Sequence, residues 1–131
     1  MEKKSWKQIQ NKLDKIVFHE KFDLVVAIAR GGVIPGFLIS KKIKKGLELI
    51  WLRFRDDENK VVFRHPKLIK KTEFNFEGKK ILLVDDISRT GTTFKAASKY
   101  LKGVKSIKTF VINGKADYFL YDQECFKFPW N

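Results

Sequence analysis

An apolar run that ends in two adjacent carboxylates constrains the fold of this chain more than any other segment. Residues 81–84 read Ile-Leu-Leu-Val, and Asp85 and Asp86 follow directly. A loop of small residues, Thr90-Gly91-Thr92-Thr93, then leads into a segment with helical periodicity. A strand buried on both faces, polar groups at its carboxyl end and a loop at a helix N-terminus are typical of a parallel α/β sheet. The segment therefore predicts acceptors for hydroxyls or a metal beside backbone donors for a phosphate.

The rest of the chain alternates strand and helix patterns in the same way. We expect strands over residues 24–29, 47–54, 80–84, 106–112 and 118–121. We expect helices over residues 6–17, 33–45 and 92–101, the first of them capped by Ser5. This order predicts an α/β fold, a doubly wound, mostly parallel sheet of about five strands with flanking helices. In such sheets ligands bind beyond the carboxyl ends of the strands, where the glycine loops at 30–32 and 90–91 would converge.

Length and composition favour one ordered domain. The chain has 131 residues, of which 44% are hydrophobic. A lone cysteine, Cys125, excludes an internal disulfide framework and fits a reducing compartment. The first residues lack the apolar run of a signal peptide, and no apolar stretch approaches the ~20 residues that span a bilayer. We therefore expect a cytoplasmic protein without a membrane partner.

The positive charge of the chain is concentrated in one region. The net charge is +13, and residues 41–80 hold 13 Lys or Arg against 6 Asp or Glu, a net +7. Such a field would suit nucleic acid, an acidic partner or a highly phosphorylated small molecule. Simple solubility explains the same charge equally well. Charge alone does not decide between these alternatives.

The two carboxylates and the loop after them are candidates for binding a sugar phosphate. Adjacent side chains on a strand point to opposite faces, so Asp85 and Asp86 are not expected to form a close acid–base dyad. They are suited to accept hydrogen bonds from vicinal ribose hydroxyls, directly or through Mg²⁺ with its waters. The backbone N–H groups and hydroxyls of residues 90–93 suit a phosphate monoester. No Walker or dinucleotide-binding glycine motif occurs, so nucleoside triphosphate or dinucleotide binding is not indicated.

Three segments together resemble a known family. Residues 84–93, Val-Asp-Asp-Ile-Ser-Arg-Thr-Gly-Thr-Thr, closely resemble the phosphoribosyl-pyrophosphate (PRPP) motif of the type I phosphoribosyltransferases. Residues 29–32, Ala-Arg-Gly-Gly, are similar to the pyrophosphate loop of that family. The ending Phe128-Pro129-Trp130, preceded by Asp117-Tyr118, is similar to the hood of the xanthine–guanine branch. The resemblance covers nearly the full chain.

The resemblance implies a reaction and an organisation. The reaction is transfer of the 5-phosphoribosyl group from PRPP to a 6-oxopurine (xanthine, guanine or hypoxanthine), with Mg²⁺ as cofactor and release of pyrophosphate, as in purine salvage. Residues 1–131 would form a single phosphoribosyltransferase domain. Its core would cover about 1–113, its hood about 114–131, and a flexible loop about 55–72. The family also implies a homodimer or homotetramer.

The resemblance also implies roles for individual residues. Asp85, Asp86 and Arg30 would be catalytic, and the two carboxylates would also hold the metal. The ribose and 5'-phosphate site would consist of Asp85, Asp86, Ser88, Arg89, Thr90, Gly91, Thr92 and Thr93. The pyrophosphate site would consist of Ala29, Arg30, Gly31 and Gly32, with a cis peptide bond at Ala29–Arg30 or Arg30–Gly31. Lys115, Cys125 and Phe126 would contact the base.

Two positions depart from the family's pattern. Arg89 stands directly before Thr90, where purine-specific members usually have an aspartate as general base, and an arginine cannot accept a proton. Either another group assists, or the base reacts as its anion, which favours xanthine, or Arg89 binds phosphate, or the chain is not catalytic. Cys125 stands where the branch usually stacks a tryptophan on the base, and a shift of one residue would let Phe126 stack instead. Phe128 and Trp130 are interpreted as core residues.

A second function competes with the enzyme. The basic region at 41–80 and the missing general base at Arg89 favour a PRPP- or nucleotide-sensing regulator that binds nucleic acid through the same fold. No helix-turn-helix pattern is evident in the sequence. Nucleic acid is therefore a less favoured partner that the sequence does not exclude.

Overall fold

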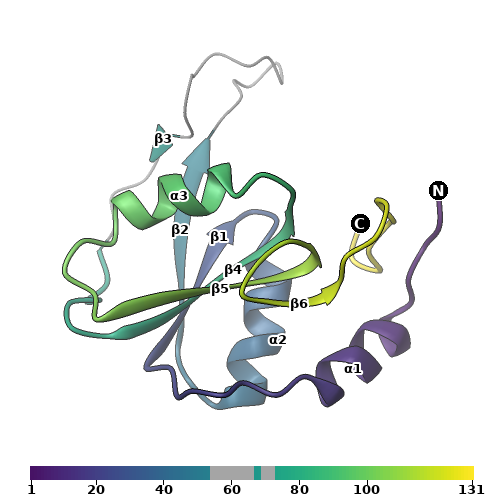
Figure 1. The fold of residues 1–131 in the computed structure, drawn as a ribbon, viewed down its shortest axis with the longest axis horizontal. Coiled ribbons are helices and arrows are strands. Elements are labelled where there is room, and N and C mark those ends of the chain that lie inside the picture. The colour runs from purple at the N-terminus through teal and green to yellow at the C-terminus, as the bar shows by residue number, and fades with distance from the viewer. Residues whose placement is uncertain (54–66, 69–72) are drawn as a thin grey trace.

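A mixed sheet forms the centre of the molecule in the computed structural model, which describes residues 1–53, 67–68 and 73–131 (Figure 1). In chain order its described strands are β1 (Leu24–Ala29), β2 (Leu47–Arg53), β3 (Lys67–Leu68), β4 (Lys80–Ser88), β5 (Ser106–Gly114) and β6 (Tyr118–Tyr121). Their order in the sheet is β3-β2-β1-β4-β5-β6. Strands β1, β2, β4, β5 and β6 run parallel to one another, and β3 pairs antiparallel with the end of β2. The predicted α/β fold with a mostly parallel sheet of about five strands is confirmed.

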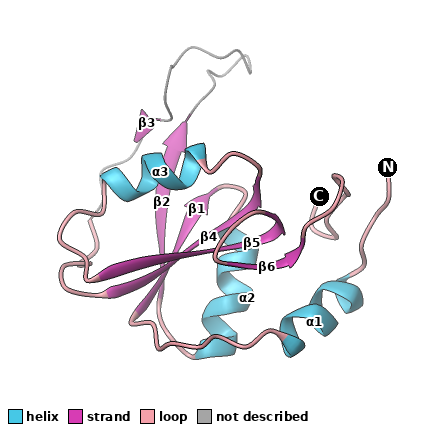
Figure 2. Ribbon diagram, viewed as in Figure 1, coloured by secondary structure: helices cyan, strands magenta, loops and turns pink. Residues whose placement is uncertain are grey.

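Helices cover both faces of the sheet (Figure 2). They are α1 (Trp6–Lys15), α2 (Val33–Ile43) and α3 (Thr92–Lys99). The first two pack on one face, where Leu82 and Val84 contribute to the buried cluster. The third packs on the other face, against Ile81 and Leu83. Successive residues of β4 therefore fill opposite cores, which explains why this strand is an unbroken apolar run.

Local signals decide where the helices begin and end. Ser5 caps α1 because its hydroxyl accepts a hydrogen bond from the Gln8 N–H at 3.1 Å, while the Gln8 side chain accepts one from the Ser5 N–H at 2.8 Å. The helix ends at Lys15, before the predicted position 17, because Ile16 is extended. The helix α2 ends at Ile43, since Lys44 takes the left-handed conformation with φ of 58°.

The strand β4 is longer than its apolar run predicts. It continues past Val84 to Ser88, because its end pairs with β5 up to the register Ser88↔Gly114. A Cβ atom on Gly114 would lie 1.9 Å from the Ser88 carbonyl oxygen, and φ at Gly114 is 131°. Only a glycine permits this close approach of the two strand ends. The extended pairing carries both aspartates to the edge of the sheet.

Most of the region predicted as a flexible loop, residues 55–72, lies outside the described residues. Within it Lys67 and Leu68 form β3, and they pair with Arg53 and Leu52. Among the helices that the structure describes, none is both long and apolar enough to cross a bilayer.

The two ends of the chain lie side by side (Figure 1). Lys3 and Lys127 form a parallel bridge. The Lys4 N–H donates to the Lys127 carbonyl at 3.0 Å, and the Lys127 N–H donates to the Glu2 carbonyl at 2.8 Å. We call residues 122–131 the C-terminal segment. The N-terminal residues thus hold this segment in place as an added strand would.

Candidate functional site

The loop between β1 and α2 lies directly against the end of β4. The peptide bond Ala29–Arg30 is cis, at one of the two positions that the sequence suggested. A Cβ on Gly31 would lie 2.7 Å from the carboxylate of Asp86, and a Cβ on Gly32 would lie 2.4 Å from the Val84 carbonyl oxygen. A larger residue at position 32 would push the loop away from the strand, and one at position 31 would displace the Asp86 carboxylate. The glycines therefore bring the proposed pyrophosphate loop into contact with the proposed ribose carboxylates.

The two aspartates lie at the carboxyl edge of the sheet in different environments. Asp85 is buried with 9% exposure, whereas Asp86 is half-buried. The Asp85 carboxylate accepts a hydrogen bond from the Asp86 N–H at 2.8 Å, and the Asp86 carboxylate accepts one from the Ile87 N–H at 2.7 Å. Burial raises the pKa of Asp85 well above 3.8, and the neighbouring charge of Asp86 raises this pKa further. A cation or hydroxyl donors at this edge would favour the ionised form.

Both carboxylates line one pocket of about 220 Å³. Its lining residues come from β1, β2, β4 and α3 and the loop after β1: Ile28, Ala29, Gly31, Leu52, Asp85, Asp86 and Thr93. Strand alternation predicts opposite faces for Asp85 and Asp86, but both line this pocket, and the Asp85 carboxylate accepts a hydrogen bond from the N–H of the residue that follows it. The pocket therefore offers two acceptor groups to one ligand.

The donor set of this pocket fits Mg²⁺ held together with a substrate. The described residues contain no group of three or more His, Cys, Asp or Glu side chains that could hold a metal ion. Mg²⁺ characteristically keeps several waters and is bound through one or two carboxylates plus substrate phosphates. Asp85 and Asp86 beside a polar pocket match that mode of binding better than they match a cage made of protein ligands.

The loop that follows β4 presents backbone donors at the start of α3. Gly91 is the N-cap of the helix and has φ of 78°, and no side chain caps it. The first turn of a helix leaves N–H groups without intrahelical acceptors, and the helix dipole favours an anion there. The hydroxyls of Thr90 and Thr92 lie 2.8 Å apart, and both are exposed. The predicted residues Thr90, Gly91, Thr92 and Thr93 thus lie at the start of α3, where the backbone is suited to an anion.

A second pocket of about 290 Å³ adjoins the first, since Gly31 and Asp86 line both. Its full lining is Arg30, Gly31, Val33, Ile34, Asp86, Trp130 and Asn131. Trp130 stacks on Phe128 with parallel rings whose centroids lie 4.9 Å apart. An aromatic ring and aliphatic side chains make this pocket suitable for a flat heterocycle.

Sequence reasoning missed the apolar residues of the second pocket. Trp130 packs against the core as interpreted, but it also lines this pocket. Val33 and Ile34 belong to the helical pattern of α2 and carry no motif. The sequence does hold one signal for Val33 and Ile34. They directly follow the Gly31-Gly32 loop, and the helix that they begin therefore starts at the carboxyl edge of the sheet.

The three residues predicted to contact the base line neither of these two pockets. Phe126 is buried with 3% exposure. Its ring makes edge contacts with the rings of Tyr121 and Phe128, with 5.2 Å between the ring centroids in each pair. Cys125 and Lys115 are exposed. The Lys115 N–H donates to the Ser88 carbonyl at 2.8 Å, which places this lysine close to the end of β4.

Arg89 contacts the C-terminal segment. Its guanidinium donates a hydrogen bond to the Gln123 carbonyl and lies 3.5 Å from the Asp122 carboxylate. Both side chains of this ion pair are about two-fifths exposed, at 39% and 42%. Arg89 therefore joins the loop before α3 to the beginning of the C-terminal segment.

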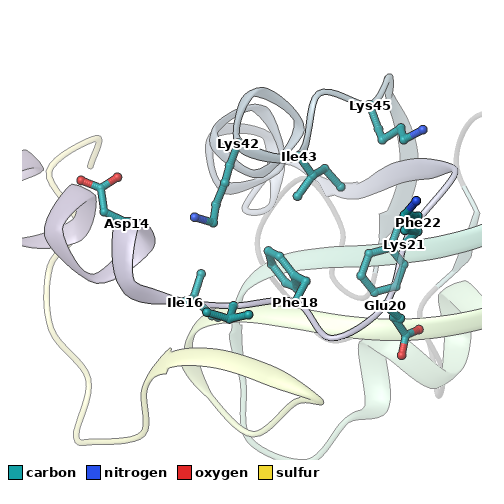
Figure 3. A pocket seen from close by; sticks show the side chains of 10 residues that line it. Asp14, Ile16, Phe18, Glu20, Lys21, Phe22, Lys42, Ile43 and Lys45 are labelled. Atoms are coloured by element: carbon teal, nitrogen blue, oxygen red, sulfur yellow. The ribbon is translucent and has the colours of Figure 1, made fainter.

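Another pocket, of about 430 Å³, lies at the amino end of β1, away from the ligand edge (Figure 3). It is formed by the segment after α1 and by the end of α2, where Phe18 and Ile43 point toward each other and the Lys42 side chain extends toward Ile16. None of the predicted site residues lines it. The candidate site is therefore the pair of adjoining pockets at the carboxyl edge.

Comparisons with known proteins agree with this geometry. A family profile described as phosphoribosyl transferase domain matches residues 2–129. The chain is 31% identical over 97 residues to a transcriptional regulator GfcR of Methanococcus maripaludis. That match covers 73% of this chain and 46% of the relative, so the chain spans about half the length of this curated protein.

Solved structures share the fold at low sequence identity. A purine phosphoribosyltransferase from Pyrococcus horikoshii superposes with a TM-score of 0.82 at 24% identity, covering 99% of this chain and 93% of that one. A xanthine-guanine-hypoxanthine phosphoribosyltransferase from Helicobacter pylori gives a TM-score of 0.72 at 20% identity, covering 98% and 90%. At these identities the likeness establishes the fold.

Proposed function

The chain belongs to the phosphoribosyl transferase domain family, and from this premise we propose that it transfers the 5-phosphoribosyl group of PRPP to a 6-oxopurine. The proposal includes Mg²⁺ as cofactor, a role in purine salvage, a cytoplasmic location and assembly into a homodimer or homotetramer. Purine and xanthine-guanine-hypoxanthine phosphoribosyltransferases among the structural neighbours support the class of substrate.

The adjoining pockets are the observation that carries this proposal. A transferase must hold its donor and its acceptor in contact, because proximity and orientation supply much of the rate. The first pocket offers carboxylates near a helix N-terminus, which suits a ribose phosphate. The second offers Trp130 and Ile34, which suit a purine ring. Asp86 and Gly31 line both pockets, so the reacting carbon of the ribose would lie at their junction.

Each part of PRPP has a matching group in this arrangement. Asp85 and Asp86 would accept hydrogen bonds from the ribose hydroxyls and would hold Mg²⁺. Residues 90–93 and the first turn of α3 would hold the 5'-phosphate. Arg30 and the backbone of Gly31 would hold the pyrophosphate. Mg²⁺ bound with PRPP would neutralise charge on the departing pyrophosphate.

The chemistry requires stabilisation of separated charge. Loss of pyrophosphate leaves positive charge on the ribosyl ring, as in glycosyl transfer. The carboxylate of Asp86 is suited to stabilise this charge, and the guanidinium of Arg30 is suited to stabilise the charge on the leaving group. Arg89 cannot accept the proton of the purine. We therefore propose a base acidic enough to react as its anion, with xanthine ahead of guanine and hypoxanthine.

An assay of product formation tests the proposal. PRPP, Mg²⁺ and one base at a time would be supplied, the bases being xanthine, guanine, hypoxanthine, adenine and uracil. We expect turnover of a 6-oxopurine, with a rate for xanthine that rises as the pH passes the pKa of the base itself. Absence of turnover with every base would overturn the enzymatic proposal.

A second function is favoured by one specific observation. The 31% identical relative carries the name of a transcriptional regulator, and this chain matches 46% of it. The net charge of +13 and Arg89 in place of a general base fit a sensor of PRPP that binds nucleic acid. Binding to DNA or RNA would then fall steeply with salt and would change with PRPP. Salt-sensitive binding that responds to PRPP, without turnover of any base, would favour the regulator over the enzyme.

A further inference from the structure

We infer that Arg89 is a positioning residue that ties the phosphate loop, residues 90–93, to the C-terminal segment and thereby sets the affinity for the purine. The inference deepens the proposed function and rests on it. It assigns a task to the position at which this chain departs from the purine-specific pattern.

The first step is the contact itself. Arg89 follows the last residue of β4 and precedes the loop, so its backbone is fixed by the sheet. Its side chain extends to the Gln123 carbonyl and to the Asp122 carboxylate, 3.5 Å away. A charged donor strengthens a hydrogen bond to a carbonyl. A half-exposed ion pair adds little by itself, so the bond to Gln123 is the main connection.

The backbone of Gln123 is held from two sides. Its N–H donates to the side chain of Asn113 at 3.1 Å, and its carbonyl accepts from Arg89. Asn113 is fully buried, and its amide also donates to the Glu124 carbonyl at 3.3 Å. Asn113 belongs to β5 and Arg89 follows β4, so neighbouring strands fix the beginning of the C-terminal segment.

The same segment ends in the lining of the second pocket. Trp130 lines that pocket together with Arg30 and Ile34, and its ring stacks on Phe128. Phe128 is 1% exposed and cannot shift without moving its neighbours in the core. A displacement at Gln123 would therefore reach the pocket proposed for the purine through the two buried rings of the segment, Phe126 and Phe128, the second of which stacks on Trp130.

An acidic side chain at position 89 could not make this connection. A carboxylate accepts hydrogen bonds and cannot donate one to the Gln123 carbonyl. It would also carry the same charge as Asp122, so the attraction between positions 89 and 122 would be replaced by repulsion. With arginine at position 89, the chain lacks a side chain that could accept a proton there, but it has one that holds the purine pocket in position.

Steady-state kinetics of the full chain separate a positioning role from the alternatives. Arg89→Gln should raise KM for the purine by about three- to tenfold, the loss of one hydrogen bond to a charged donor, and leave kcat and KM for PRPP within about twofold. Arg89→Lys should recover part of the loss, since it keeps a cationic donor. Lys99→Gln, at an exposed position at the end of α3, is the matched control for lost charge.

Two kinetic outcomes would overturn the inference. A rise in KM for PRPP with an unchanged KM for the purine would make Arg89 a phosphate ligand. Unchanged constants in Arg89→Gln would show that the contact does not position the pocket. Asp122→Asn should give a smaller effect in the same direction as Arg89→Gln, because it removes only the exposed ion pair.

Hydrogen exchange tests the tie without any turnover. Amides of residues 122–124 should exchange faster in Arg89→Gln than in the unchanged chain, while amides of α1 should not change. If the unchanged chain turns over no base, the proposed function fails, and this measurement still decides whether the tie exists. Unchanged exchange at residues 122–124 would overturn the inference even in an active enzyme.

Discussion

The two halves of the candidate site are built in different ways. The donor side, which we propose for PRPP, consists of short continuous segments at the ends of β1 and β4. The acceptor side, which we propose for the purine, combines Val33 and Ile34 with Trp130, about a hundred residues later in the chain. Backbone geometry and glycines shape the donor side, whereas contacts between distant side chains shape the acceptor side. The donor side is therefore rigid and can be predicted from local sequence, whereas the acceptor side depends on the whole fold.

The largest effect is expected where the donor side tolerates no added atom. In Gly32→Ala the new Cβ would meet the Val84 and Ile28 carbonyl oxygens at 2.4 and 2.8 Å, and neither backbone group can move freely. We expect the free energy of unfolding to fall by about 3 kcal/mol or more, measured by urea denaturation. Gly46→Ala is the matched control, because its Cβ would find only a Leu24 methyl group at 3.7 Å. Equal stability of the two variants would refute the close contact between the loop and β4.

Asp86 tests the chemistry of the donor side without disturbing its backbone. Asp86→Asn keeps the shape and removes the charge that both pockets share. We expect kcat/KM to fall by about a hundredfold or more, as for other groups that stabilise developing charge. Circular dichroism should show the fold unchanged. Full activity in this variant would exclude a role for the Asp86 charge.

Trp130 tests the acceptor side. Trp130→Ala removes the ring that lines the second pocket. We expect KM for the purine to rise by about tenfold, the scale of one aromatic contact, with KM for PRPP nearly unchanged. A loss of PRPP binding instead would mean that the pockets are not independent. Calorimetric titration with PRPP and Mg²⁺ provides this control.

We expect the smallest change in stability at Asp85. Its substitution should increase stability but decrease activity. Burial raises its pKa above the unfolded value of 3.8, so the folded state binds the proton more tightly than the unfolded state. The contribution of Asp85 to the free energy of unfolding is fully favourable below pH 3.8, and it weakens as the pH rises toward the pKa of the folded state. Asp85→Asn should therefore increase the free energy of unfolding at pH 7 by on the order of 1 kcal/mol while it lowers activity.

The pH dependence provides the check on this prediction. The gain in stability from Asp85→Asn should shrink as the pH approaches 3.8, because the unchanged protein is then protonated at this site as well. Thermal unfolding of both proteins across this range measures the difference. A gain that is constant with pH would show that Asp85 is ionised in the folded state at ordinary pH values.

The contrast between the two sides also explains what the sequence could predict. The sequence predicts the buried strand before Asp85 and Asp86 and the turn at Thr90-Gly91 into a helix, because apolar runs and glycine loops act through neighbouring residues. The resemblance to the type I phosphoribosyltransferases is confirmed by the family match and the fold. These features need no knowledge of distant partners.

The acceptor side could not be predicted from local patterns. The burial of Phe126 and the position of Trp130 follow from the pairing of Lys3 with Lys127 and from the tie between Asn113 and Gln123. Such contacts join residues that no periodicity relates. The extension of β4 to Ser88 has the same cause, because its length is decided by a partner strand and by the space that Gly114 leaves.

The bridge between Lys3 and Lys127 has a consequence for chain entropy. It brings together two ends that in the unfolded chain are far apart, and the entropic cost of closing such a long loop grows only slowly with its length. A covalent cross-link between positions 3 and 127 would restrict the unfolded state and so remove part of that cost from folding. The cross-linked form should therefore keep the C-terminal segment against the N-terminal residues at temperatures that separate them in the unlinked form.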